Sequence, residues 1–169
     1  MTKFNGFDFY DKKQVVLTNG VPSAYVNAAS NQKITSVYVP ANTFVAGDIL
    51  HIEWIVRLTG LTSGNFSSNL YWNETDDLTT PTQLTSRSVA NSNIGYKQNR
   101  RLSIAVANGT GNGSITYGVG TGLDSDFAAA TFAISSGLAL NWTIDSYIIL
   151  AGFCGTGTGV RTEFFKVSN

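Results

Sequence analysis

The sequence has little of the residue types on which most catalytic and metal sites depend. It contains one cysteine and one histidine among 169 residues. A single cysteine excludes an intrachain disulfide and a thiolate cluster for zinc, and a single histidine excludes histidine-rich zinc sites. A Ser-His-Asp triad would need His51, which alternates with Ile49 and Glu53 in a strand-like pattern. We therefore predict a satisfied or interfacial histidine, and no catalytic residue, metal or cofactor.

Charge is also scarce. Charged residues make up 13% of the chain, about half the usual share, and the formal net charge is zero. The surface must then consist largely of Ser, Thr, Asn and Gly, as is common where molecules pack side by side in assemblies. Neutrality gives no electrostatic basis for binding nucleic acid. No apolar run reaches the roughly 18 residues of a membrane helix or forms a signal peptide, so we expect no membrane insertion and synthesis in the cytoplasm of the producing cell.

What the sequence does contain is a series of short alternating segments. Hydrophobic residues at 43% and aromatic residues at 12% exclude disorder. Turn signals separate the segments at near-regular spacing, and no amphipathic helix is present. The predicted strands are 14–17, 33–39, 49–58, 66–73, 83–89, 100–107, 114–119, 127–134, 140–153 and 160–167. This pattern predicts an all-β protein, and its length favours a single antiparallel jelly-roll sandwich of about 8–10 strands over an immunoglobulin domain.

The segment 140–153 is apolar on both of its predicted faces. An antiparallel sheet normally leaves one face in water, so something else should cover the second face of this strand. We predict that Tyr147, Ile149 and Phe153, which share that face, lie against another subunit.

The first 20 residues predict an N-terminal arm with a first short strand, followed by the jelly-roll domain over 21–169. Four aromatic residues crowd into the arm without a clean period: Phe4, Phe7, Phe9 and Tyr10. A terminal segment of this kind is ordered only when something ties it down, so we expect it to dock on a partner or on a neighbouring subunit. The alternative is an edge strand of the same domain.

Several other clusters were weighed as sites and interpreted as ordinary surface or loop features. They are the acidic residues Glu74, Asp76 and Asp77, the pair Asp124 and Asp126, the glycine-rich stretches 118–122 and 155–159, and the basic residues Lys97, Arg100 and Arg101. The acidic loops lack the spacing of an EF-hand, and the glycine-rich stretches lack the lysine and the following helix of a phosphate-binding loop.

Aromatic residues near loops offer one alternative binding site. Tyr71, Trp72, Tyr96 and Tyr117 could stack on sugar rings, with nearby Asn and Asp side chains as hydrogen-bond partners. Packing in the core or in an interface is the other interpretation of the same residues.

Three stretches resemble a known group of proteins. They are Asn42–Leu50 (NTFVAGDIL), Asn69–Asn73 (NLYWN) and Asn141–Ile149 (NWTIDSYII). Together they resemble the small jelly-roll proteins of tailed bacteriophages, which are similar to tumour-necrosis-factor-like trimers and serve as head fibres, capsid decorations or fibre tips. The resemblance covers roughly residues 33–167 and rests on strand patterns.

The resemblance implies a homotrimer on the virion surface, anchored to other virion proteins by the arm, with its loops presented outward. A threefold axis would also cover the second face of the strand 140–153. The alternative function is a receptor-binding fibre tip that recognises a glycan on the host cell. An enzyme is the third and least favoured class.

Overall fold

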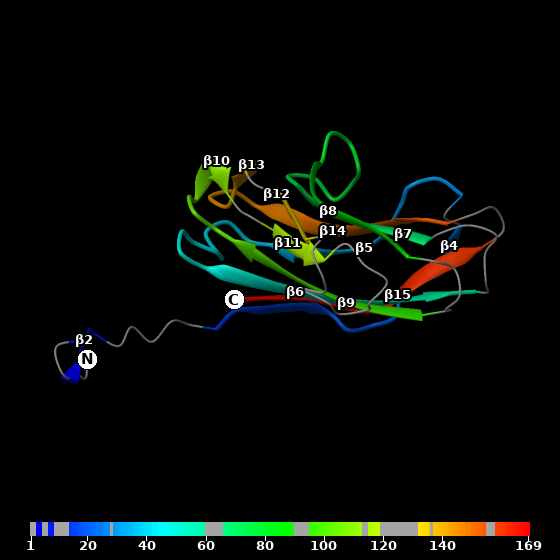
Figure 1. The fold of residues 1–169 in the computed structure, drawn as a ribbon, viewed down its shortest axis with the longest axis horizontal. Helices are drawn as coiled ribbons and strands as arrows, with labels where there is room; N and C mark the ends of the chain where they lie inside the picture. Colours follow the sequence, from blue (N-terminus) through cyan, green and yellow to red (C-terminus); the bar gives the residue numbers. More distant parts are fainter. Residues whose placement is uncertain are drawn as a thin grey trace.

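The fold is that of a computed structural model, which describes residues 3–4, 7–8, 14–27, 29–59, 66–89, 95–112, 115–118, 132–135, 137–154 and 158–169. All regular structure in these ranges is β-strand, and every strand pairing is antiparallel. Two large sheets face each other (Figure 1). The predicted all-β class and the sandwich architecture are confirmed.

The strands form two large sheets and two small pairs. The seven-stranded sheet has the order β12 (Phe132–Ser135), β11 (Ile115–Gly118), β9 (Gly95–Ser103), β6 (Ile49–Leu58), β15 (Gly159–Ser168) and β3 (Val16–Asn19), with β4 (Val26–Asn27) also paired to β15. The four-stranded sheet has the order β5 (Gln32–Val39), β14 (Ser146–Phe153), β7 (Phe66–Asn73) and β8 (Thr82–Val89). The small pairs are β10 (Asn108–Asn112) with β13 (Leu138–Asn141), and β1 (Lys3–Phe4) with β2 (Phe7–Asp8).

The pairings are nested along the chain. β3 pairs with β15, β5 with β14, β6 with β9, and β7 with β8. The first and last of these strands are therefore partners, and the innermost pair is formed by strands that follow one another. The pairing is that of one long antiparallel hairpin, and its successive strand pairs belong alternately to the two sheets.

The core lies between the sheets because each long strand turns its apolar set inward. In β6 the buried residues are Leu50, Ile52, Trp54, Val56 and Leu58, which is the alternation that the sequence predicts. Aromatic rings fill the middle of the layer. Phe66 stacks on Tyr96 with ring centroids 5.8 Å apart. One polar contact bridges the two sheets inside this core, where the Ser68 hydroxyl donates to Gln98 Oε1 over 2.9 Å.

The apolar segment 140–153 is not one strand. It divides into β13 and β14, and residues 142–145 between them form a turn. The turn begins where Asn141 Oδ1 accepts hydrogen bonds from the Thr143 N–H (3.0 Å) and the Thr143 hydroxyl (2.6 Å). A short polar side chain that binds the backbone two residues later is a common way to start such a turn. Only 146–153 therefore lies in the four-stranded sheet.

Two further boundaries differ from the prediction. The strand expected over 100–107 is β9, Gly95–Ser103, and the Asn108-Gly109 pair, a dipeptide typical of tight hairpin turns, lies in a strand instead. Asn108 and Gly109 lie in β10, paired with Asn141 and Leu140 of β13. Their pairing partner is about 30 residues away in the sequence, which a local turn signal could not indicate.

A β-bulge changes which residues of β15 face inward. The pairing of β15 with β6 shifts register between Thr162 and Phe164, so Glu163 is the extra residue. Val160 and Thr162 are buried before the bulge, and Phe165 and Val167 are buried after it. Strict alternation placed Phe164 with Val160 and Thr162, and this assignment is wrong.

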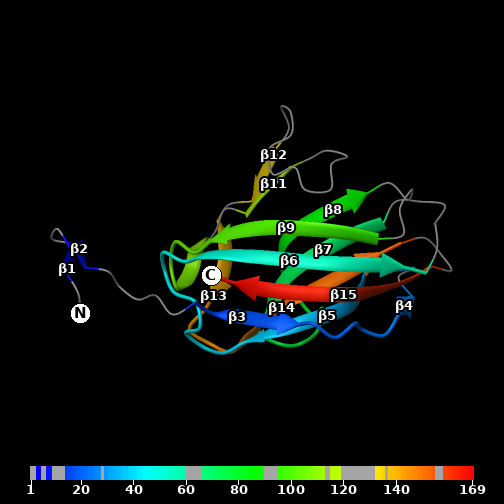
Figure 2. The same cartoon turned by 90° about the horizontal axis from the view of Figure 1, so that it is seen from below.

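The arm begins with a small paired element that the sequence analysis did not predict. Lys3 pairs with Asp8 and Phe4 with Phe7, and this pair lies outside the two large sheets (Figure 2). The missed signal is the dipeptide Asn5-Gly6, which favours a two-residue hairpin turn. Phe9 and Tyr10 lie outside the described residues, as do the side chains of Phe4 and Phe7. β3, at the end of the arm, is the edge strand of the seven-stranded sheet.

Candidate functional site

The outward face of β14 is the surface on which the sequence places a subunit contact. Ile148 and Leu150 point into the core, so Tyr147, Ile149 and Phe153 lie on the opposite face of the four-stranded sheet. These three residues differ in exposure. Ile149 is fully buried within one chain, Tyr147 is half-buried, and Phe153 at the end of the strand is 42% exposed. Their burial against another subunit stays a prediction, and Ile149 does not need a second chain to cover it.

A tyrosine pair occupies the start of this face. Tyr38 of β5 lies opposite Tyr147 of β14 in the strand register, and their ring centroids are 5.4 Å apart. Tyr38 is 46% exposed. Sequence analysis did not select Tyr38, although an aromatic residue on the same strand face as the polar Ser36 was the available signal.

Asp145 fixes the pair in place. Its carboxylate accepts a hydrogen bond from the Ala41 N–H over 2.9 Å, and this bond, followed by one from the Tyr38 hydroxyl, lowers the pKa of Asp145. The same contact with Asp145 raises the pKa of Tyr38. The Tyr38 ring is therefore held on the β14 face by the carboxylate of Asp145, and these hydrogen bonds favour the charged form of that carboxylate.

A set of polar side chains linked by hydrogen bonds lies beside Ile149. Tyr71 of β7 is the register partner of Ile149, and the Asn31 amide donates to the Tyr71 hydroxyl over 3.0 Å. The Asn69 amide in turn donates to Asn31 Oδ1 over 2.8 Å. The apolar face is thus closed inside one chain at its centre, while its two ends present exposed aromatic rings.

Two of the four aromatic residues proposed for sugar stacking lie away from the surface. Trp72 and Tyr96 are buried in the core, where Trp72 meets Trp142 edge-on at 6.5 Å and Tyr96 stacks on Phe66. Neither ring can reach a ligand from this position. Tyr71 lies on the outward face of the four-stranded sheet, and the Tyr117 side chain lies outside the described residues. The reason is the alternation of β7, which sends Phe66, Leu70 and Trp72 inward.

The acidic loop between β7 and β8 is held by contacts within the chain. Asp76 forms an ion pair with Lys33, and the Asp77 carboxylate accepts the Thr79 N–H over 2.7 Å. That backbone hydrogen bond is the main reason why the pKa of Asp77 is lowered. Within the described part of the chain, no group of three or more His, Cys, Asp or Glu side chains is arranged to hold a metal.

The outward face of the seven-stranded sheet carries several charged residues. His51 of β6 lies between Arg101 of β9 and Ser168 of β15, and Glu53, two residues further on, pairs in register with Asn99 and Lys166. These residues line a shallow polar depression of about 430 Å³. Glu53 also forms an ion pair of 2.8 Å with Lys97. His51 is exposed here on a charged sheet surface.

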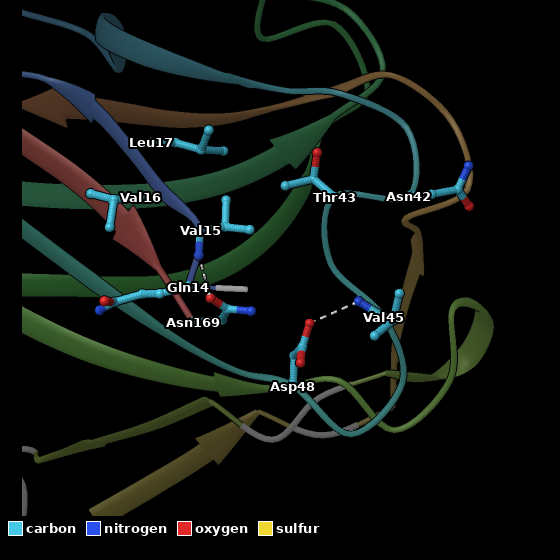
Figure 3. A pocket seen from close by; sticks show the side chains of 9 residues that line it. All are labelled: Gln14, Val15, Val16, Leu17, Asn42, Thr43, Val45, Asp48 and Asn169. Atoms are coloured by element: carbon cyan, nitrogen blue, oxygen red, sulfur yellow. Dashed lines mark hydrogen bonds between the residues drawn. The ribbon is translucent and has the colours of Figure 1, made fainter. Parts of the chain in front are cut away.

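A groove with a volume of about 590 Å³ lies at the edge of this sheet (Figure 3). The start of β3 forms one wall, the loop between β5 and β6 forms the other, and the C-terminal residue lies between them. The lining residues are Gln14, Val15, Val16, Leu17, Asn42, Thr43, Val45, Asp48 and Asn169.

Both walls of the groove are fixed by hydrogen bonds to the backbone. The Val15 N–H donates to Asn169 Oδ1 over 2.8 Å, and this bond joins the residue before β3 to the residue after β15. The Val45 N–H donates to the buried carboxylate of Asp48 over 2.9 Å, and Gly47 supplies the positive φ of 91° that this turn needs. The groove is therefore a shaped surface with an apolar wall of valines and a polar rim.

No protein-family model matches the chain, and no curated protein matches it. Within the described ranges, no helix is long and apolar enough to cross a membrane. The features that bear on function are therefore the β14 face, the groove beside β3 and the resemblance of the strand patterns.

Proposed function

We propose that the protein is a structural component of a bacteriophage particle: a homotrimeric jelly-roll subunit displayed on the virion surface after synthesis in the host cytoplasm. The observation that carries the proposal is the outward face of β14, where the exposed aromatic residues Tyr38 and Phe153 flank a centre that is already closed. Such a face offers exposed aromatic area for contact with another subunit and does not form a concave active site.

The nested strand pairing supports the jelly-roll part of the proposal. In a jelly roll, a long antiparallel hairpin is wrapped into two facing sheets, so strands distant in sequence become neighbours. The pairs β3–β15, β5–β14, β6–β9 and β7–β8 have this order, and the first and third contribute to one sheet while the second and fourth contribute to the other.

The composition of the β14 face supports self-association. Aromatic residues are enriched in protein interfaces, and charged residues are depleted at their centre. Tyr38, Tyr147 and Phe153 supply the aromatic surface. A closed cyclic arrangement would bury this face in every copy, as most homo-oligomers do with their contact patches. Because Ile149 is already buried, the contact is assigned to the two tyrosines and Phe153.

The low charge of the chain and its resemblance to phage jelly-roll proteins support a place on a virion. The test is imaging of phage particles that carry this gene, compared with particles in which the chain is deleted. We expect a threefold-symmetric density on the surface of the first that is missing from the second. Purified particles that contain no copy of the chain would contradict the proposal.

A further inference from the structure

The groove beside β3 lies where the N-terminal arm joins the body of the protein. Gln14, the first residue described after β2, is part of the groove wall, and Val15, Val16 and Leu17 continue it (Figure 3). Across the groove, Val45 is 47% exposed. A surface with apolar walls on both sides and polar atoms at its rim is suited to an apolar peptide segment.

The groove also runs along an unpaired strand edge. β3 is the last strand in the order of the seven-stranded sheet, so among the described residues one of its two edges has no strand partner within that sheet. Such edges readily accept another peptide segment, with the backbone groups giving affinity and the side-chain pockets giving specificity.

The β1–β2 hairpin of the arm requires further contacts to be stable. β1 and β2 have two residues each and pair only with one another. A single two-stranded hairpin is at best marginally stable in water, and this one is far shorter than a hairpin that could stand alone. Its strands bring Phe4 and Phe7 to the same register position.

We propose that the groove of each copy receives the Lys3–Asp8 hairpin of a neighbouring copy, with Phe4 and Phe7 against the valine wall. This inference rests on the self-assembly proposed above and adds the surface that receives the arm. Asn42 and Thr43 at the rim offer hydrogen-bonding groups to the incoming backbone.

A second copy fits this role better than the chain's own arm. The own arm would have to reverse direction within residues 9–13, directly before the groove wall begins, and Asp11 is the one residue of this sequence stretch whose type favours a tight turn. An arm that continues outward has ample reach instead, because 13 extended residues span up to about 45 Å.

Disulfide trapping tests the exchange directly. Two differently tagged full-length chains are co-expressed, one with Phe7→Cys and the other with Val45→Cys, and the assembly is oxidised mildly. The native Cys154 is buried and is present in every variant, so it does not account for a difference between them. We expect a covalent species that contains both tags. Val21→Cys in place of Val45→Cys is the matched control, because Val21 is 74% exposed and lies beyond the other end of β3.

The possible outcomes separate the two proposals. A species of trimeric mass without the mixed crosslink would overturn the arm exchange and leave the trimer standing. A crosslink within single chains that carry both Phe7→Cys and Val45→Cys would do the same. A monomer at every concentration would overturn both proposals.

Loss of the groove should also weaken the assembly. Val45→Asp places a charge on the apolar wall. We expect the concentration below which the assembly dissociates to rise about tenfold or more. Val21→Asp should leave it unchanged. Equal dissociation of the Val45→Asp variant and the unaltered protein, with thermal unfolding showing both folded, would contradict the role of the groove.

Discussion

The Ser68–Gln98 contact shows how a single polar pair can matter inside an apolar layer. Both residues are buried, and their hydrogen bond joins β7 of one sheet to β9 of the other. A buried acceptor that loses its donor carries the full cost of desolvation, whereas a typical surface substitution changes stability very little.

Ser68→Ala should therefore lower the free energy of unfolding by about 1–3 kcal/mol, measured by urea denaturation. Ser67→Ala, one residue earlier on the half-buried opposite face of β7, is the control and should stay within about 0.5 kcal/mol. Equal effects of the two substitutions would show that the Gln98 oxygen finds another donor.

Asp145 makes stability depend on pH in a defined direction. Its pKa is lowered in the folded chain by the Ala41 N–H and the Tyr38 hydroxyl, so the ionised form binds these donors best. The stabilising effect is complete above the ordinary Asp pKa, near pH 4, and is lost as the pH falls through the lower folded-state pKa. Denaturation midpoints should therefore fall less steeply below pH 4 in Asp145→Asn than in the unaltered protein. Parallel pH profiles would refute this role.

Individual core residues were more predictable than their possible functions. The alternation of β7 already placed Trp72 with Phe66 and Leu70, which argued for the core. Tyr96 had no such signal, because the predicted strand began at residue 100, four residues too late to include it. Tyr38 was missed because Ser36 on the same strand face is polar, and because its pairing with Tyr147 depends on a strand more than 100 residues away.

At the scale of elements, the sequence predicts strands well where apolar and polar residues alternate without interruption. β6 and β7 begin and end where the pattern indicates, at 49–58 and 66–73. The pattern fails where a side chain redirects the backbone, as Asn141 does before Thr143, or where a bulge inserts a residue, as at Glu163. The bulge depends on the partner strand, which local periodicity does not contain.

β14 packs so closely against its neighbours that it needs a glycine near its end. A Cβ atom on Gly152 would lie 2.8 Å from Ile34 Cδ1 and 3.0 Å from Phe66 Cε2. Ile34 reaches this position because a register shift between β14 and β5 makes it an extra buried residue.

Gly152→Ala should destabilise the protein by about 1–3 kcal/mol through overpacking. Gly20→Ala is the matched control, because the nearest atom to its Cβ would be 3.8 Å away and its φ is not positive. Thermal unfolding of the two variants compares them, and a neutral Gly152→Ala would mean that Ile34 and Phe66 can move apart.

At the scale of the molecule, composition and turn spacing were enough to predict an all-β sandwich. The order of the strands was not predictable, because each nested pair except β7–β8 joins segments separated by tens of residues. The seven-stranded sheet and the groove beside β3 follow from that order. The groove has no signature of its own in the sequence, since its walls come from residues 14–17, 42–48 and 169.

The central claim is that the outward face of β14 joins copies of this chain into a trimer. Sedimentation velocity of the full chain over a range of concentrations tests it most directly, with Phe153→Lys as the disrupting variant and Val21→Lys, at a more exposed position, as the control. We expect a mass three times that of one chain for the unaltered protein and for the control. For Phe153→Lys we expect the mass to shift toward that of one chain. A single-chain mass for the unaltered protein at every concentration would contradict it.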